Sequence, residues 1–232
     1  MPKRLSQMQV DSYHRDGFVC PVDVISDDKA ALLRRRLERA EQRYPHAVNA
    51  ENRNNAHLVL KCVDEIAHHP SMLDAVEDLI GPDILIWGTV LFIKEPDSEA
   101  FVSWHQDMTY PPLHPHDGVT AWLALTPSNR ESGCMRMIPG SHRGGIRAHH
   151  DRYGEHNILT RGQTVEGLDE SLAVDVILEP GQISLHHGRT IHGSPANRSD
   201  RRRIGIAIQQ YLPPHVKELH ERGFAQLARG CD

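Results

Sequence analysis

The sequence lacks the features that mark membrane and secreted proteins. None of its apolar runs, within 232 residues, approaches the roughly 18 residues that a membrane-spanning helix needs. The N-terminal segment carries basic residues with no apolar stretch behind them, so we expect neither a signal peptide nor an anchor. We therefore expect a cytoplasmic protein with no membrane partner.

Cysteine is scarce and scattered, which excludes a disulfide-based scaffold. The chain has four, with no CxxC pair among them. This usage fits reduced thiols in a reducing compartment. The four positions are Cys20, Cys62, Cys134 and Cys231.

The signatures of several other protein classes are missing too. There is no HExxH, GxSxG, P-loop or GxGxxG motif, so no hydrolase or nucleotide-binding signature competes with the interpretation below. The net charge of -5 argues against a nucleic-acid partner. The one dense basic cluster contains Arg198, Arg201, Arg202 and Arg203, and we expect its first three members to form a solvated face.

The first 82 residues have mainly helical patterns. Ser26 precedes a segment in which Ala30, Leu33 and Leu37 recur at helical spacing, which predicts an amphipathic helix over 27–44. A second helix is predicted from Pro70 to the Gly-Pro pair at 81–82. We expect both helices to pack against a larger unit.

From residue 83 the sequence changes to short β-branched and aromatic segments separated by turn residues. This pattern predicts a mostly β fold, a sandwich or a barrel, rather than a parallel sheet. Residues 143–171 interrupt the series with a polar segment that we interpret as a lid loop. With no linker or repeat, we expect a single domain, with residues 1–82 packed on a barrel core of residues 83–212. The predicted strands lie in 84–94, 101–107, 119–126, 134–139, 173–179, 182–187 and 203–211.

Histidine is the residue type in excess, with 17 in the chain, and two histidines suggest a metal site. His105 and Asp107 are two positions apart in a predicted strand, so both side chains would project from one face. A third ligand is needed, and His192, before a Gly-Ser-Pro turn, is the best candidate. Two histidines and one carboxylate leave coordination positions open, the arrangement typical of non-haem Fe(II) oxygenases.

Such a centre commonly uses 2-oxoglutarate, whose distal carboxylate needs a cation. Arg203 follows His192 after a turn and offers a guanidinium that binds carboxylates with two parallel hydrogen bonds. The hydroxyl of Ser194 is placed to share that carboxylate. Lys61 and Lys94 are further candidates to reach the cosubstrate, but we assign neither, because lysines near strands and helix ends are usually solvated.

The sequence resembles the phytanoyl-CoA dioxygenase family of Fe(II)/2-oxoglutarate-dependent oxygenases, from "YHRDGFVCPVDV" to "IQQYLPP". The matching pieces are the "HQD" at 105–107, "AWLALTPSNRESGCMRMIPGSH" at 121–142, "PGQISLHHGRTIHGSPANRS", and Arg203. The resemblance implies a double-stranded β-helix, a cupin-like jelly-roll barrel with flanking helices. It implies that His105, Asp107 and His192 hold Fe(II), and that Arg203, Ser194 and Trp122 line the 2-oxoglutarate pocket, with O2 as cosubstrate and ascorbate as a candidate reductant.

The resemblance also implies an oxygenase that releases succinate and CO2. Hydroxylation of an unactivated C–H bond in a small metabolite or natural-product intermediate is the leading prediction. Asp107 favours it over chlorination, because related halogenases have a small residue there that admits chloride. Desaturation, epoxidation and ring formation by the same oxygen chemistry stay open. A non-catalytic metal-binding cupin module is the rival class, although it would have no need of Arg203.

Residues after the ligand motif are candidates for contact with the substrate. Met108, Thr109 and Tyr110 mix apolar and polar groups, which suits a small molecule. A CoA ester would require a basic groove for its phosphates, and none remains once Arg203 is assigned. Members of the family often continue past the last strand, so we expect a C-terminal segment that shields the pocket to be missing. The sequence holds no indication of the oligomeric state.

Overall fold

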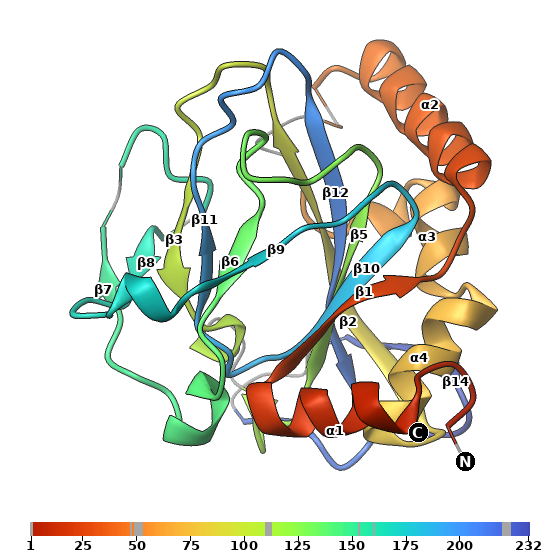
Figure 1. Cartoon of the computed structure of the whole chain (residues 1–232). Helices are drawn as coiled ribbons and strands as arrows, with labels where there is room; N and C mark the ends of the chain where they lie inside the picture. Colours follow the sequence, from red (N-terminus) through yellow and green to blue (C-terminus); the bar gives the residue numbers. More distant parts are fainter. Residues whose placement is uncertain are drawn as a thin grey trace.

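Two antiparallel sheets face each other in the computed structural model, which describes residues 2–46, 48, 53–109, 113–152, 154–159, 161–219 and 224–232 (Figure 1). The larger sheet contains, in spatial order, β1 (Phe18–Asp23), β10 (Gln182–His187), β5 (Val119–Ala124), β12 (Arg203–Leu212), β2 (Ile84–Lys94) and β14 (Gln226–Arg229). The smaller sheet contains β3 (Val102–His105), β11 (His192–Ser194), β6 (Met135–Met137) and β9 (Val174–Val176). Two short pairs complete the strands: β4 (Leu113–His114) with β13 (Lys217–Glu218), and β7 (His150–Asp151) with β8 (Gln163–Thr164).

The helices lie mainly on the outer side of the larger sheet, as Figure 1 shows for α2, α3 and α4. The two predicted helices are present: α2 begins after Ser26, whose side chain accepts a hydrogen bond from the Lys29 amide, and α4 begins at Pro70. The helices are α1 (Gln7–Asp16), α2 (Asp27–Arg43), α3 (Lys61–Ala67) and α4 (Pro70–Ile80), with 3-10 turns η1 (Ala56–Leu58), η2 (Asp107–Thr109), η3 (Ser141–Gly144) and η4 (Glu170–Leu172). Among the residues that the structure describes, no helix is both long and apolar enough to span a membrane.

Alternation along the strands divides the larger sheet into a helix-facing side and an inner side. In β12, Ile204, Ile206 and Ile208 belong to the hydrophobic core shared with the helices. Arg203 and Ala207 alternate with them and point between the two sheets, where they line a pocket. Because side chains alternate along the strand, every second residue of β12 from Ile204 to Ile208 packs in the core beneath the helices, and the residues between them face the site.

The fold class predicted from the sequence is confirmed, and the structure corrects several details. The N-terminal region is not entirely helical, because Phe18–Asp23 forms β1 at the edge of the larger sheet. Asp107 does not share a strand with His105, since β3 ends at His105 and Asp107 opens the turn η2. Arg202 is not a solvated residue, because its guanidinium pairs with Glu41 and Glu95. That the chain forms a single domain stays a prediction.

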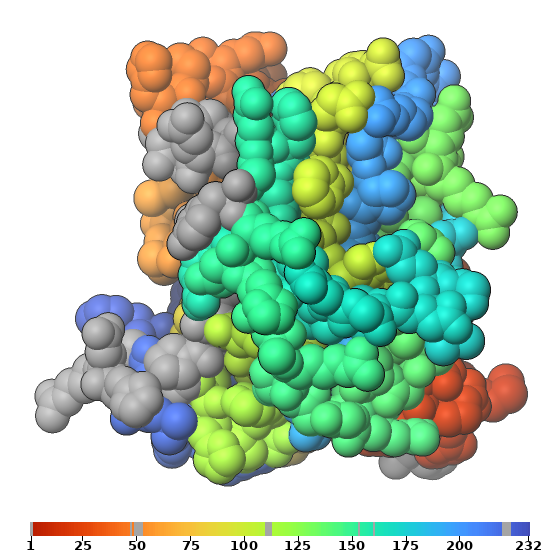
Figure 2. Space-filling view, turned by 90° about the vertical axis from the view of Figure 1, so that its left-hand side faces the viewer, coloured from red at the N-terminus to blue at the C-terminus, as the bar shows by residue number. Residues whose placement is uncertain are grey.

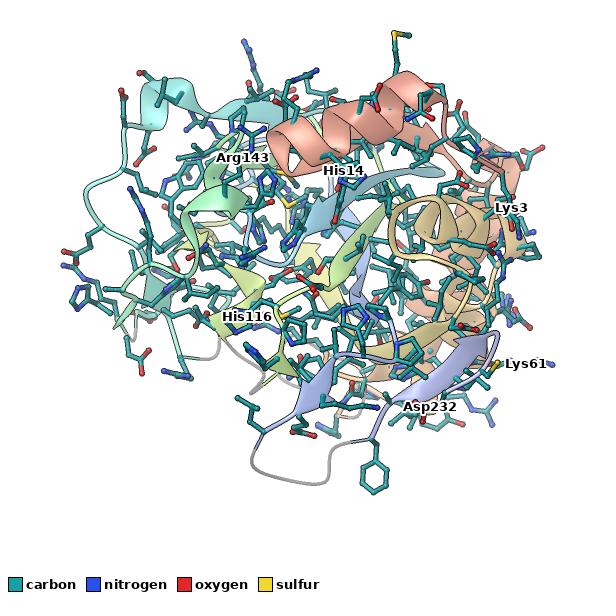
Figure 3. The ribbon with its side chains drawn as sticks, turned by 90° about the horizontal axis from the view of Figure 1, so that it is seen from below. Lys3, His14, Lys61, His116, Arg143 and Asp232 are labelled. Atoms are coloured by element: carbon teal, nitrogen blue, oxygen red, sulfur yellow. The ribbon has the colours of Figure 1, made fainter. Side chains whose placement is uncertain are left out.

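The predicted lid segment, residues 143–171, runs along the outside of the smaller sheet. β8 lies against β3, where the Val165 amide donates to the Trp104 carbonyl over 2.7 Å. Arg143, at the start of the segment, lies beside α1 and donates to the Arg15 carbonyl over 2.5 Å (Figure 3). Figure 2 shows much of the segment, in green to teal, spread over one face of the molecule.

Candidate active site

The three predicted metal ligands come together between the sheets. His105 is the last residue of β3 and His192 the first of β11, and the two are directly paired across these antiparallel strands. Asp107 Oδ1 lies 3.5 Å from His105 Nε2 and 3.6 Å from His192 Nε2. All three donor atoms fall within 4.8 Å of one another, and all three residues are buried. An ion held at about 2.1 Å from each donor fits between atoms separated by roughly 3 to 4 Å.

Both imidazoles are held in the form that a metal requires. His105 Nδ1 lies 2.9 Å from the carbonyl of Ser103, and His192 Nδ1 lies 2.9 Å from that of Thr190. Because a carbonyl only accepts, Nδ1 carries the proton and the Nε2 lone pair points to the shared centre. Burial and the neighbouring His105 ring lower the pKa of His192 well below its usual value, which favours the neutral, ligating imidazole.

The second oxygen of Asp107 is oriented by three side chains from the larger sheet. Oδ2 accepts from the Thr120 hydroxyl over 2.6 Å and from Gln210 Nε2 over 3.3 Å, and it lies 3.2 Å from His186 Nε2. Burial opposes ionisation, but the surrounding imidazoles of His192, His105 and His186 hold the pKa of Asp107 well below its usual value. The carboxylate therefore stays ionised with Oδ1 turned toward the two histidines.

Gln210 reaches Asp107 because β12 is irregular at this point. The pairing of β12 with β5 shifts between Ile208 and Tyr211, and Gln210 has a φ of 65°. A bulge with one residue in the left-handed region re-aims a side chain relative to the regular alternation. Gln210 is fully buried, and its amide nitrogen also donates to the Thr120 hydroxyl over 3.0 Å.

A pocket lies beside this centre. Its walls combine the three predicted ligands with apolar residues from both sheets and with the predicted cosubstrate residues. The lining residues are Phe92, Val102, His105, Asp107, Thr120, Trp122, Met135, Leu159, His186, His192, Gly193, Ser194, Arg203, Ala207 and Gln209.

Arg203 is the cation of this pocket, and only 2% of it is exposed. Its Nη1 donates to the Gly133 carbonyl over 2.7 Å, and its guanidinium carbon lies 5.2 Å from the centre of the Trp122 ring. Its Nε has no hydrogen-bond partner in the described part of the chain, and no carboxylate there is among the groups that shift its pKa. Burial lowers the pKa of Arg203 to about 10, which still leaves it charged at neutral pH. Burying a guanidinium without a carboxylate partner is costly, so we expect this group to bind an anionic ligand.

Gly205 gives Trp122 the room to lie beside Arg203. A Cβ atom at Gly205 would come within 2.0 Å of the Trp122 ring. The ring therefore crosses β12 where the strand has no side chain, and it stacks against the guanidinium two residues away.

Ser194 also lines the pocket, and a buried lysine stands behind it. Lys94 Nζ lies 2.6 Å from the Ser194 hydroxyl oxygen, and Lys94 is fully buried. The expectation that Lys94 is solvated is therefore wrong. Lys61 follows that expectation, because its side chain is 83% exposed and points away from the molecule (Figure 3).

Two of the three predicted substrate residues, Met108 and Thr109, are not among the residues that line the pocket. Met108 is buried in a separate cluster with Leu85, Leu113, Leu212 and Val216, because η2 turns it away from the ligands. The Thr109 hydroxyl donates to the Gln106 carbonyl over 2.7 Å. The structure brings neither residue to the pocket wall. Tyr110 lies outside the described residues.

Sequence reasoning assigned no residue to the orientation of Asp107. The side that His186 faces follows from alternation, because it is paired with Thr120 across β10 and β5. The side that Gln210 faces does not, because a bulge reverses it. Gln106, between two ligands, was also overlooked, although it is fully buried and its side chain bonds residues 145, 147 and 189.

The fold and this site define a class of protein. Two facing antiparallel sheets with two histidines, one carboxylate and a buried arginine between them are the arrangement of the non-haem iron oxygenases that use a facial triad. Residues 13–205 match the family model "Phytanoyl-CoA dioxygenase (PhyH)". The chain therefore belongs to the phytanoyl-CoA dioxygenase family.

Individual relatives agree with this membership. The chain is 31% identical over 165 residues to a probable alpha-ketoglutarate-dependent hypophosphite dioxygenase of Stutzerimonas stutzeri, covering 68% of this chain and 57% of that protein. Two relatives named phytanoyl-CoA dioxygenase, from Caenorhabditis elegans and Homo sapiens, are covered over 48% and 42% of their length. The chain thus spans about half the length of the curated relatives it matches.

Solved structures agree over almost the whole chain. The apo form of the non-heme monooxygenase ThoJ superposes with a TM-score of 0.86 at 33% identity, covering 97% of this chain and 84% of that one. The carbocyclase SnoK from nogalamycin biosynthesis gives 0.72 at 24% identity, covering 94% and 89%, which shows the shared fold alone. The prediction of the family is confirmed. The names of the relatives cover several reaction types, so the reaction is not fixed by membership.

Proposed function

We propose that this protein is an Fe(II)- and 2-oxoglutarate-dependent oxygenase that hydroxylates a C–H bond of a small polar molecule. The observation that carries the proposal is Arg203, a buried guanidinium without an acidic partner in the described chain, which lines the same pocket as His105, Asp107 and His192. A site that only stored a metal would have no use for this arginine, because burying an unpaired charge destabilises a fold. When bound, iron, 2-oxoglutarate and dioxygen supply the oxidising chemistry, with release of succinate and CO2.

The protein's own contribution is to hold and orient. His105, Asp107 and His192 would bind the iron through Nε2, Oδ1 and Nε2, and their hydrogen bonds fix the three donors before the metal arrives. Arg203 and Ser194 would bind the distal carboxylate of 2-oxoglutarate, while Trp122 forms a wall of the pocket. The buried surroundings exclude water and strengthen these charge interactions.

Asp107 supports oxygen transfer over chlorination. Its carboxylate is fixed by Thr120 and Gln210, so it fills a position that a halide would need. The resident carboxylate therefore favours hydroxylation over chlorination.

We place the substrate in a second pocket that adjoins the first and shares Phe92, Leu159 and Gln209 with it. Its other walls offer an indole from Trp87, amides from Asn54 and Asn55, and the guanidinium of Arg53. These groups suit a small molecule with polar and apolar parts. One arginine among the described lining residues is a poor match for the several phosphates of a CoA ester, which supports a free metabolite.

The proposal is tested by spectroscopy and by product analysis. Anaerobic addition of Fe(II) and 2-oxoglutarate to the protein should produce a weak metal-to-ligand charge-transfer band in the green. In air, the correct substrate should trigger succinate formation from a panel of small metabolites, and mass spectrometry should find one added oxygen atom. A protein that gives no band and forms no succinate would contradict the oxygenase assignment.

A further inference from the structure

We propose that Lys94 is a positioning residue for the cosubstrate, which takes up a proton when the distal carboxylate of 2-oxoglutarate binds and thereby turns the Ser194 hydroxyl toward that carboxylate. This inference rests on the proposed function, because it concerns the same pocket. It adds a role for a lysine that does not line the pocket itself.

Lys94 is buried at the end of β2 with three oxygen atoms around its amine. Nζ lies 2.6 Å from the Ser194 hydroxyl and 3.4 Å from the Ser194 carbonyl, and it also bonds the Pro195 carbonyl. The side chain is therefore anchored to the strand β11 and the turn that follows it. Ser194, which faces the pocket, is the only one of these partners that can turn a proton toward a ligand.

The charges around Lys94 are unbalanced. Lys94 and Arg203 are paired across β2 and β12, so two cationic groups are buried side by side. The titratable groups that act on Lys94 are Arg203, from β12, and the thiol of Cys134, next to β6. In the described chain, no carboxylate is among them, since Glu95, the next residue, pairs with Arg202.

This imbalance makes Lys94 an amine that changes its protonation state easily. Burial, followed by repulsion from Arg203, lowers the pKa of Lys94 to about 6, against a smaller opposite effect of Cys134. Near pH 7.5 most molecules without an anion therefore have a neutral amine. A carboxylate beside Ser194 and Arg203 supplies the missing negative charge and raises this pKa again.

The change of charge reverses a hydrogen bond. A neutral amine has two protons, which satisfy the carbonyls of Ser194 and Pro195, and its lone pair accepts the Ser194 hydroxyl proton. A protonated amine donates to all three oxygens, so the Ser194 proton is released and can be donated to the bound carboxylate. The proton gained by Lys94 comes from water, and no other bond changes.

The test is the number of protons taken up on binding, measured by titration calorimetry of the anaerobic Fe(II) protein at pH 7.5 in buffers of different ionisation enthalpy. When 2-oxoglutarate binds, the protein should take up about one proton per molecule of ligand bound. Pyruvate chelates iron in the same way but has no distal carboxylate, so it reports the protons exchanged at the metal alone. We expect no uptake with pyruvate.

The matched variant is Lys94→Met, which keeps the length of the side chain and removes the amine. It should bind 2-oxoglutarate more weakly and without proton uptake. In the wild-type protein the dissociation constant should rise with pH above about 6, by up to about tenfold per pH unit, and this dependence should be absent in the variant.

The outcomes separate this inference from the proposed function. Equal proton uptake with 2-oxoglutarate and pyruvate, or none with either ligand, would overturn the role of Lys94 while the charge-transfer band leaves the oxygenase assignment intact. If the wild-type protein binds no 2-oxoglutarate at all, both fail. Should Lys94→Met not fold, the comparison of the two ligands on the wild-type protein still decides the matter.

Discussion

At the scale of single residues, the pocket divides its polar groups between two tasks. His105, Asp107 and His192 converge on one point, whereas Arg203, the first residue of β12, has its guanidinium against Trp122. The two tasks are separable, because the groups that fix the metal ligands differ from those that contact Arg203. Substitutions at the two places should therefore have different effects.

Removing the arginine should affect the cosubstrate and spare the metal. For Arg203→Ala, we expect the KM for 2-oxoglutarate to rise on the order of 100-fold, since hydrogen bonds to charged groups contribute roughly 1.5–3 kcal/mol each. Iron affinity, measured by anaerobic titration, should stay near that of the wild type. His192→Ala should instead abolish iron binding. Equal loss of iron affinity in both variants would refute the assignment.

At the scale of elements, the site depends on how the segment 143–171 is attached to β3. Gln106 follows His105, and its side-chain nitrogen Nε2 donates to the backbone carbonyls of Gly145 and Arg189 over 2.8 and 2.7 Å. Its side-chain oxygen Oε1 accepts from the backbone amide of Arg147 over 2.8 Å. One buried side chain thus links the metal-ligand motif to the start of the segment and to the loop before β11.

Shortening this side chain should loosen the segment. We expect Gln106→Ala to destabilise the protein by about 1–3 kcal/mol, because buried backbone groups lose their partners. Amide hydrogen exchange should speed up around residues 145–149 and stay unchanged in α4, which provides the internal control. Unchanged exchange in 145–149 would mean that other contacts hold the segment.

Sequence patterns predicted most strands of the two facing sheets and missed others, among them β1 and β11. β2 and β10 have the predicted bounds, since an apolar run between prolines and an alternating segment are strong local signals. β1 contains Pro21 and β11 has three residues, so neither produces such a pattern. Their strand conformation comes from pairing with β10 and β3, which only the complete fold supplies.

The site was predictable where its residues are close in sequence or typical in type. The spacing of His105 and Asp107, and the number of residues between His192 and Arg203, can be read from the sequence alone. Thr120, His186 and Gln210 come from three different strands, and they meet only because β10, β5 and β12 are neighbours. Their role in orienting Asp107 follows from topology and from a bulge, neither of which local patterns contain.

At the scale of the whole molecule, buried neutral histidines make the fold sensitive to acid. Burial, followed by the charge of Arg189, lowers the pKa of His187 to about 4. Its Nδ1 accepts a hydrogen bond from the Arg189 amide over 3.1 Å, which requires the neutral ring. The unfolded chain, with an ordinary histidine, binds this proton already near pH 6.5.

Stability should therefore fall as the pH decreases from about 6.5 to about 4, because the unfolded state binds more protons in this range. The contribution of His187 amounts to at most about 3 kcal/mol, at 1.36 kcal/mol per pKa unit. Urea unfolding of the metal-free protein at pH 7.5 and pH 5 measures it. His187→Gln retains an acceptor without titrating, so its stability should change less between the two pH values. An identical loss in the variant would assign the acid sensitivity to other groups.

The direct pairing of His105 with His192 also means that metal binding can report on correct folding. A slip of β11 by one residue along β3 would carry the His192 imidazole to the opposite face of the sheet and bring Gly193 or Ile191 to its place. Because β11 is three residues long, few backbone hydrogen bonds oppose such a slip. A bound ion requires both imidazole rings on one side of the smaller sheet. It would therefore stabilise chains in which β11 has the correct register relative to those in which it has slipped.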